Sequence, residues 1–187
     1  PEELARRLAF RRRASIGDVD IRLATPVATA DLHAHRFTLN SGAELNYAEH
    51  ALTAGPGRGD DDIAAVAVGE DGTERELTHA ELRDLVARAR AGLAAAGVGV
   101  GDRVVALAPN SVETLVAFLA TASLGAVWSS CSPDFGSRAV LDRFAQIEPT
   151  VLIAVDGYRY NGKRFDVRET VSALRAALPT LSATVLV

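Results

Sequence analysis

The chain has 187 residues, of which 48% are hydrophobic, and its formal net charge is -4. A chain of this length can bury one sizeable core. Its negative net charge argues against a general nucleic-acid-binding surface, and no apolar run reaches the roughly eighteen residues of a membrane-spanning helix. The single cysteine excludes an internal disulfide and fits a reducing compartment. These features together predict a globular, cytoplasmic protein.

The amino-terminal part, residues 1–43, gives little structural information. It carries an arginine-rich run at 6–13, for which the alternatives are a targeting peptide, a nucleic-acid-binding arm or a solvated helix face. Acidic residues nearby favour the solvated face. His33 and His35 have no neighbouring cysteine or acidic cluster that would complete a metal site. We assign no function to this part. Because the chain contains no methionine and begins at Pro1, we expect it to be a piece of a longer protein.

The next part of the chain alternates short elements with loops. The spacing predicts an amphipathic helix over Glu44–Leu52, then a loop over Ala54–Asp62. Three successive aspartates end this loop, and a solvated turn fits them better than a cation site, because neighbouring carboxylates point in different directions. Strands are predicted at Ile63–Val68 and Glu74–Leu77, with a turn between them.

A long helix is predicted over Thr78–Ala96. Thr78 and Glu81 have the spacing of a capping box, and apolar residues follow at helical spacing. The glycine-rich segment Gly97–Gly101 follows this helix and precedes a strand. A phosphate-binding loop has the opposite order, so we interpret the segment as a connector.

The centre of the chain predicts a strand, a helix and a second strand. Val104–Ala108 is an unbroken apolar run, as in a strand covered on both faces. Asn110 is the predicted cap of the helix, with Glu113 near its positive end. The second strand begins at Ala126–Ser129. Such a unit is typical of a parallel sheet.

The remaining elements extend this pattern to the last residue. They are a helix over Ser137–Ile147 capped by Ser137, a strand over Val151–Val155, a polar loop over Asp156–Phe165, a helix that begins at Asp166 or Thr170 and ends at Pro179, and a strand over Thr184–Val187. The alternation predicts an α/β fold with a mainly parallel sheet and helices on both faces.

Ligands of such sheets bind beyond the carboxyl ends of the strands, where three loops are expected: Pro109–Ser111, Ser129–Gly136 and Asp156–Phe165. The second loop holds serines and Cys131, but no nucleophile motif surrounds them, and we assign no catalytic residue and no metal ligand. The third combines basic side chains with tyrosines, a composition that suits a phosphorylated, ring-bearing ligand. An exposed, charged turn is the alternative, and composition alone favours it.

Two stretches carry a resemblance to a known family. The segment from ELTHAELRDLVARARAGLAAAG to GAVWSS, continued by CSPDFG and GYRYNGKRF, resembles the AMP-forming acyl-CoA synthetases, which belong to the adenylate-forming ligases. The resemblance covers Glu44–Val187 and is strongest to the members that activate acetoacetate, and 1–43 match poorly. It implies the first α/β subdomain of the large domain of such a ligase, truncated at its carboxyl end.

The resemblance also implies a reaction and its participants. Such enzymes convert an acid and ATP, used with Mg²⁺, into an acyl-adenylate, and the thiol of coenzyme A then displaces AMP. The partners are thus small molecules, without nucleic acid or membrane. In related acetyl-CoA synthetases, the loop that matches Gly157–Lys163 holds the nucleotide phosphate of coenzyme A. Carried over by position, Arg159, Gly162 and Lys163 are the predicted binding residues, and Asn161 resembles an insertion.

The family's phosphate loop, adenylate-binding motifs and catalytic lysine have no counterpart in this sequence, so the chain by itself is predicted to be inactive. Lys163 is its only lysine, and it stands in a different context. The rival hypothesis is a non-catalytic α/β module that binds a nucleotide or a protein partner.

Overall fold

The computed structural model of the protein describes residues 14–16, 19–21, 27–31, 36–39 and 44–187. The arginine-rich run at 6–13 and the pair His33 and His35 lie outside these residues. Among the described residues, five short strands and a helix come first: β1 (Ala14–Ile16), β2 (Val19–Ile21), β3 (Val27–Asp31), β4 (Arg36–Leu39), β5 (Glu44–Asn46) and α2 (Tyr47–Leu52). β1 pairs with β2, and β3, β4 and β5 form an antiparallel sheet.

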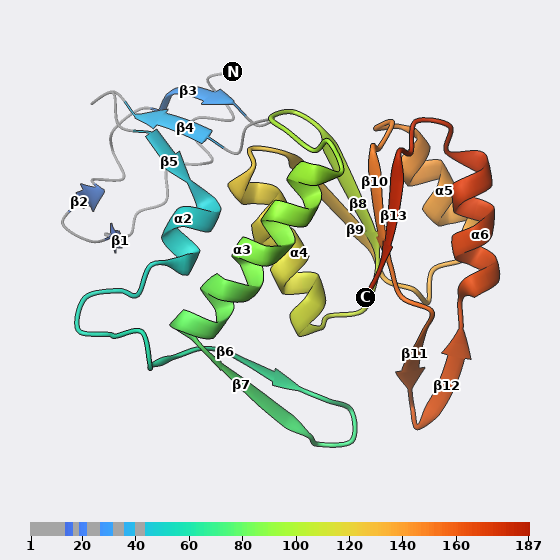
Figure 1. Ribbon diagram of the computed structural model, residues 1–187, viewed down its shortest axis with the longest axis horizontal. Coiled ribbons are helices and arrows are strands. Elements are labelled where there is room, and N and C mark those ends of the chain that lie inside the picture. The colour runs from blue at the N-terminus through green and yellow to red at the C-terminus, as the bar shows by residue number, and fades with distance from the viewer. Residues whose placement is uncertain (1–13, 17–18, 22–26, 32–35, 40–43) are drawn as a thin grey trace.

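The rest of the chain forms the larger part of the molecule (Figure 1). Its elements are β6 (Ile63–Val68), β7 (Glu74–Thr78), α3 (His79–Ala95), β8 (Arg103–Leu107), α4 (Val112–Ser123), β9 (Val127–Cys131), α5 (Ser137–Ala145), β10 (Val151–Ala154), β11 (Gly157–Tyr160), β12 (Lys163–Asp166), α6 (Arg168–Ala177) and β13 (Ala183–Leu186).

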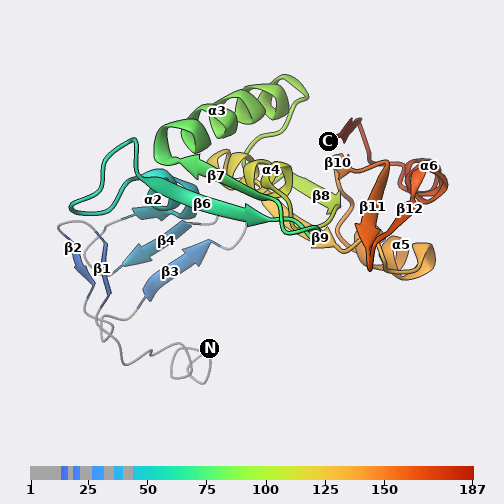
Figure 2. The same ribbon diagram turned by 90° about the horizontal axis from the view of Figure 1, so that it is seen from below.

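A four-stranded parallel sheet forms the centre, with the strand order β13-β10-β8-β9. The helices α3 and α4 cover one face of this sheet, and α5 and α6 cover the other (Figures 1 and 2). The predicted α/β class, with a parallel sheet between helices, is confirmed.

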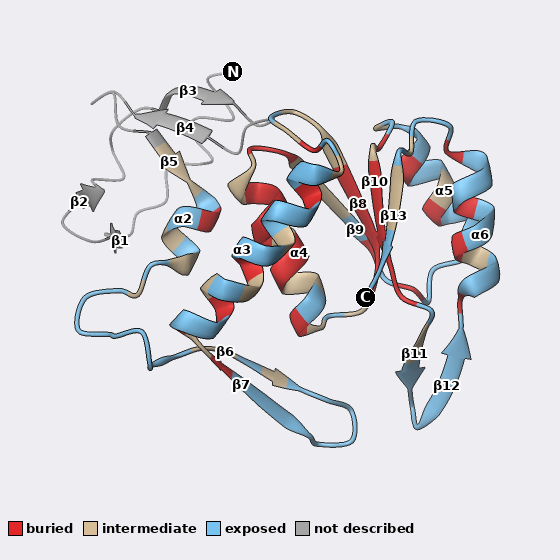
Figure 3. Cartoon of the chain, viewed as in Figure 1, coloured by how far each residue is buried: buried red, intermediate tan, exposed pale blue. Residues whose placement is uncertain are grey.

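The core follows from this double cover. All four residues of β10 are buried, as are the last four of β8, because strands between two helix layers meet no water. Figure 3 shows the buried positions concentrated on these strands and on the inner sides of the helices. α4 is buried on more than one side, because it lies between the sheet and α3. Val116 and Ala120 are buried, whereas Leu115 and Phe118 are only half-buried.

The predicted sheet is wrong for the strand Ile63–Val68, which does not join the parallel strands. β6 pairs with β7 as an antiparallel hairpin, and neither strand joins the parallel sheet. Every residue of β6 is exposed or half-buried, unlike the buried runs of β8 and β10. A strand that is solvated on one face belongs to an antiparallel pair.

Several predicted boundaries and caps also differ. Glu44–Asn46 is a strand, and the helix begins only at Tyr47, because the side chain of Asn46 accepts hydrogen bonds from the backbone N–H groups of Ala48 and Glu49. Ser111 caps α4 in place of Asn110, with its hydroxyl accepting from the Thr114 amide at 3.2 Å. Gly136 is the N-cap of α5, so Ser137 makes no side-chain cap, and this helix ends at Ala145.

No helix among the described residues is long and apolar enough to cross a membrane.

Candidate ligand-binding hairpin

The carboxyl edge of the parallel sheet contains a point where the helices change sides. α4 connects β8 to β9 on one face, and α5 connects β9 to β10 on the other. The loops that leave the neighbouring strands β8 and β10 therefore diverge, and ligands of open α/β sheets bind at such a point. Of the three predicted loops, Pro109–Ser111 and Asp156–Phe165 flank this point, and Ser129–Gly136 follows the edge strand β9.

The first of these loops borders an apolar groove. The groove has a volume of about 590 Å³ and lies between β6, the start of α4 and β9. No charged residue lines it. Its lining residues are Ala65, Val66, Ala67, Val68, Asn110, Ser111, Val112, Thr114, Leu115, Phe118, Trp128 and Ser130. The groove therefore does not suit a phosphate.

The predicted polar loop Asp156–Phe165 is folded into the antiparallel hairpin β11–β12. Asn161 and Gly162 form its two-residue turn with φ values of 51° and 72°, the left-handed conformation for which Asn-Gly is the preferred pair. At the base of the hairpin, a Cβ on Gly157 would collide with the carbonyl oxygen of Phe165. Asn161 is thus half of the turn that sets the strand register.

The register separates the two predicted cations. Arg159 lies opposite Arg164, and Lys163 lies opposite Tyr160. Because paired residues share a face and neighbours along a strand alternate, Arg159 and Lys163 lie on opposite faces of the hairpin. The face of Lys163 also carries a stacked aromatic pair, Tyr158 and Phe165, with ring centroids 5.1 Å apart. The structure thus brings Arg159 together with Arg164, and Lys163 together with the aromatic rings.

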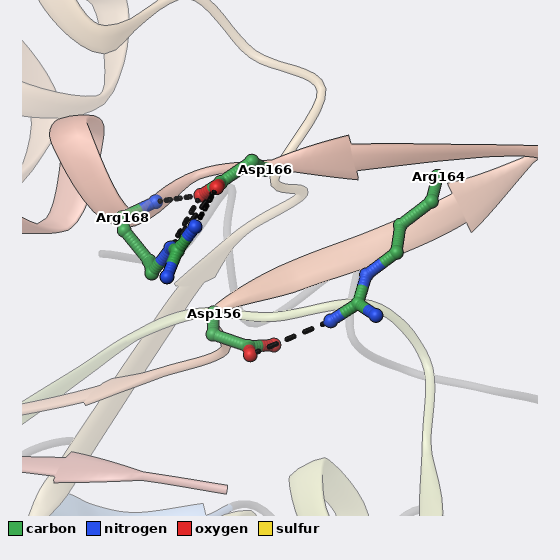
Figure 4. A network of polar contacts seen from close by, with 4 residues as sticks. All are labelled: Asp156, Arg164, Asp166 and Arg168. Atoms are coloured by element: carbon green, nitrogen blue, oxygen red, sulfur yellow. Dashed lines mark hydrogen bonds and ion pairs between the residues drawn. The ribbon is translucent and has the colours of Figure 1, made fainter.

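The cations of the hairpin differ in their ion pairs. Arg164 forms a long ion pair with Asp156, with Nη2 3.6 Å from Oδ2 (Figure 4). Neither Arg159 nor Lys163 forms an ion pair with another residue of the described ranges. Both side chains are exposed. They are therefore the two cations of the hairpin that have no ion pair within the described structure.

A second ion pair anchors the base of the hairpin to α6. Arg168 donates to Asp166 through Nε, at 3.1 and 2.9 Å, and through Nη2 at 2.5 Å (Figure 4). These bonds, together with the backbone N–H of Arg168, lower the pKa of Asp166 to about 2. The same pairing raises the pKa of Arg168. The carboxylate therefore stays charged across the neutral range and holds the chain where it enters α6.

The tip of the hairpin contacts the turn between β6 and β7. The carboxylate of Glu70 accepts hydrogen bonds from the backbone N–H groups of Asn161 and Gly162, the second at 3.3 Å. Asp71 lies beside the same tip. Its pKa is lowered mainly by hydrogen bonds from Thr73, and the charge of Arg159 adds to this shift. Both views show the two hairpin tips side by side (Figures 1 and 2).

Metal ligands are not grouped in the described residues: no set of three His, Cys, Asp or Glu side chains there could hold a metal ion. Cys131 is buried at the end of β9. His79 is the one described histidine that is buried, and it lies at the start of α3.

Comparison with known proteins identifies the family. A model described as AMP-binding enzyme matches residues 54–187. The chain belongs to the AMP-binding enzyme family. The predicted resemblance to AMP-forming acyl-CoA synthetases is thereby confirmed for the part of the chain that forms the sheet and the hairpin.

Curated members of the family share substantial identity with the chain. Acetoacetyl-coenzyme A synthetase of Rhizobium meliloti (strain 1021) is 53% identical over 136 residues, which are 73% of this chain and 20% of that protein. Acetoacetyl-CoA synthetase of Gallus gallus is 42% identical over 148 residues, 78% of this chain and 22% of that protein. The chain therefore spans about a fifth of the length of the curated relatives it matches.

Solved structures agree with this assignment. Acetoacetyl-CoA synthetase from Streptomyces lividans is 50% identical, with a TM-score of 0.75, over 87% of this chain and 25% of that chain. An acyl-CoA synthetase of Brucella canis is 26% identical, with a TM-score of 0.54, over 69% of this chain and 22% of that chain. The fold described above is thus that of a part of these ligases.

Two residues of the hairpin site were missed as binding residues in the sequence. Arg164 lies in the same basic loop, and a two-residue Asn-Gly turn pairs it with Arg159 once a hairpin is assumed. Glu70 is 91 residues from Asn161 in the chain, and no local pattern indicates their contact.

Proposed function

We propose that this chain is part of an acetoacetate–CoA ligase. In the proposed reaction, a carboxylate oxygen of acetoacetate attacks the α-phosphorus of ATP, and pyrophosphate leaves. The sulfur of coenzyme A then attacks the acyl carbon of the adenylate, its proton passes to solvent or a base, and AMP leaves with the C–O bonding electrons. The names and identities of the curated relatives support this proposal. Because both nucleotides are small cellular metabolites, the cytoplasm is the proposed compartment.

Magnesium accompanies ATP in such a reaction, where it would neutralise phosphate charge. The described residues offer no set of ligands for it, so we assign no residue of this chain to magnesium or to the adenylation step. Small molecules are the proposed partners, and we propose no nucleic acid or membrane partner.

The part of the reaction that we assign to this chain is the binding of coenzyme A. We propose that Arg159, Gly162 and Lys163 hold a phosphate of its nucleotide. The observation that carries the proposal is the position of two exposed cations without an ion pair among the described residues, on either side of an Asn-Gly turn at the carboxyl edge of the sheet. Guanidinium and ammonium groups form strong, charge-assisted hydrogen bonds with phosphate.

Gly162 has a backbone role in this proposal. Its φ of 72° is a conformation that a side chain disfavours, and its N–H group points outward from the turn toward Glu70. A phosphate at the tip would meet this N–H group as well as the two cations.

A chimeric enzyme tests whether this chain can serve as part of an acetoacetate–CoA ligase. In the chimera, residues 54–187 of this chain replace the matched segment of the Rhizobium meliloti acetoacetyl-coenzyme A synthetase. We expect acetoacetate-dependent ATP–pyrophosphate exchange and coenzyme A-dependent release of AMP to be retained. An exchange reaction that is lost in a folded chimera would contradict the proposed function and would favour a non-catalytic binding module.

Arg159→Ala in the chimera then tests the hairpin. It removes a charge-assisted hydrogen bond worth about 1.5–3 kcal/mol. The apparent affinity for coenzyme A is therefore expected to fall by about ten- to a hundredfold. Exchange of ATP and pyrophosphate without coenzyme A is expected to stay nearly unchanged. Arg90→Ala is the matched control, since Arg90 is exposed on α3 and forms no ion pair in the described ranges. Weakened use of ATP with unaltered coenzyme A kinetics would overturn the assignment.

A further inference from the structure

The tip of the β11–β12 hairpin has the geometry of an anion-binding site. Asn161 and Gly162 are consecutive, both have left-handed φ, and both backbone N–H groups point at one carboxylate. Consecutive N–H groups in a turn form a concavity that binds anions. Arg159 and Lys163 flank this turn from its two faces, so positive charge adds to the two N–H dipoles.

The anion that occupies this concavity belongs to the protein itself. Glu70 comes from the turn between β6 and β7, and both of its carboxylate oxygens accept from the tip. Its neighbour Asp71 accepts hydrogen bonds from the amide of Thr73 at 3.1 Å and from its hydroxyl at 2.7 Å. The positive charge of Arg159 also helps to lower the pKa of Asp71. An acidic turn thus lies against a basic one.

We propose that Glu70 is an internal competitor for the phosphate site at the tip of the β11–β12 hairpin. The proposal rests on the proposed function, in which a phosphate of coenzyme A binds there. A carboxylate and a phosphate oxygen both need the same N–H groups, so the ligand binds only when Glu70 has left them. The β6–β7 turn therefore acts as an autoinhibitory latch on this site.

Competition reduces the apparent affinity for the ligand to its intrinsic value multiplied by the fraction of time that the latch is open. A latch that is closed nine-tenths of the time weakens apparent binding by about tenfold. Release is feasible because Glu70, Asn161 and Gly162 are all exposed, so water can replace the bonds that are lost. The alternative role for Glu70 is support of the hairpin, in which case its removal would weaken ligand binding.

The variant Glu70→Gln separates these roles, because it keeps the shape of the side chain and removes its charge. The control is Glu76→Gln, an equal change of charge at an exposed residue of β7 that forms no ion pair in the described ranges. The first measurement is hydrogen exchange of the Asn161 and Gly162 amides in the 187-residue chain without ligand. We expect faster exchange at both amides in Glu70→Gln and no change in Glu76→Gln. Unchanged exchange would overturn the latch.

The second measurement is calorimetric binding of coenzyme A and of inorganic phosphate to the same variants. We expect Glu70→Gln to bind both about tenfold more tightly than the parent chain. Equal or weaker binding would refute competition and indicate a supporting role. The same measurements test the identity of the ligand separately from the latch. If Arg159→Ala leaves coenzyme A affinity unchanged while Glu70→Gln still strengthens phosphate binding, the latch stands and coenzyme A is the wrong ligand.

Discussion

Asp166 shows how a single residue couples the hairpin to the helix that follows it. Its carboxylate accepts from both the side chain and the backbone N–H of Arg168, so the hydrogen bonds favour the charged form and lower its pKa to about 2. The pair is exposed, and water weakens its electrostatic energy. Its contribution nevertheless depends on pH in a definite direction.

The pH dependence follows from the direction of this shift. A carboxyl whose pKa is lower in the folded protein stabilises it above the unfolded value of 3.8, and this contribution is lost as the pH falls toward about 2. We therefore expect Asp166→Asn to flatten the loss of stability between about pH 4 and pH 2. Denaturant midpoints measured from pH 2 to pH 6 check this.

Asp134→Asn is the control for that experiment, because Asp134 is exposed and forms no ion pair within the described ranges. If the denaturant midpoint falls equally steeply at acidic pH in Asp166→Asn and in the parent, the Asp166–Arg168 pair does not stabilise the folded state.

At the scale of elements, the helices begin in different ways. α3 has a complete capping box, in which the Thr78 side chain accepts from the Glu81 amide and the Glu81 carboxylate accepts from the Thr78 amide. α5 begins at Ser137 without any side-chain cap. α5 is held instead by packing, since Val140 and Phe144 are fully buried. α3 thus has a side-chain cap, whereas α5 forms without one.

The pair Thr78→Ala and Ser137→Ala tests this difference. Loss of a Thr cap typically costs about 0.5–2 kcal/mol, so we expect a fall of about that size in the free energy of unfolding for Thr78→Ala. Ser137→Ala is expected to have little effect, because its hydroxyl satisfies no N–H group of the helix. Denaturant titration of the two variants measures both changes. Equal losses would mean that Ser137 caps α5 in solution.

At the scale of the whole molecule, the parallel sheet ends at β9 and β13, which each pair with one neighbour within the described structure. β13 carries apolar side chains at this edge, and Leu186 is 63% exposed. An edge strand with unpaired N–H and C=O groups and apolar side chains can pair with another chain. We therefore expect the 187-residue chain, when isolated, to self-associate through β13.

Leu186→Lys tests that expectation, because a charged residue on an edge strand opposes pairing. Light scattering coupled to size-exclusion chromatography is expected to show a smaller mean mass for this variant than for the parent. Val100→Lys is the control, since Val100 is 75% exposed and lies between α3 and β8, outside every strand. A parent chain that is already monomeric at high concentration would contradict the prediction.

Much of the fold could be predicted because its signals are local. The apolar run of β8, the capping box of α3 and the Asn161–Gly162 turn each depend on residues within a few positions of one another. Backbone hydrogen bonding and side-chain burial impose these patterns directly on the sequence. The sequence by itself therefore determined the α/β class, most of the elements, the family resemblance and the charged turn at the edge of the sheet.

Only the tertiary structure decided how these elements meet. The strand order β13-β10-β8-β9 brings together strands that are far apart in the chain, and it leaves β6 outside the parallel sheet. The contact of Glu70 with Asn161 also joins distant residues. Such contacts depend on which buried surfaces fit together in three dimensions, and a short window of residues carries no record of that fit.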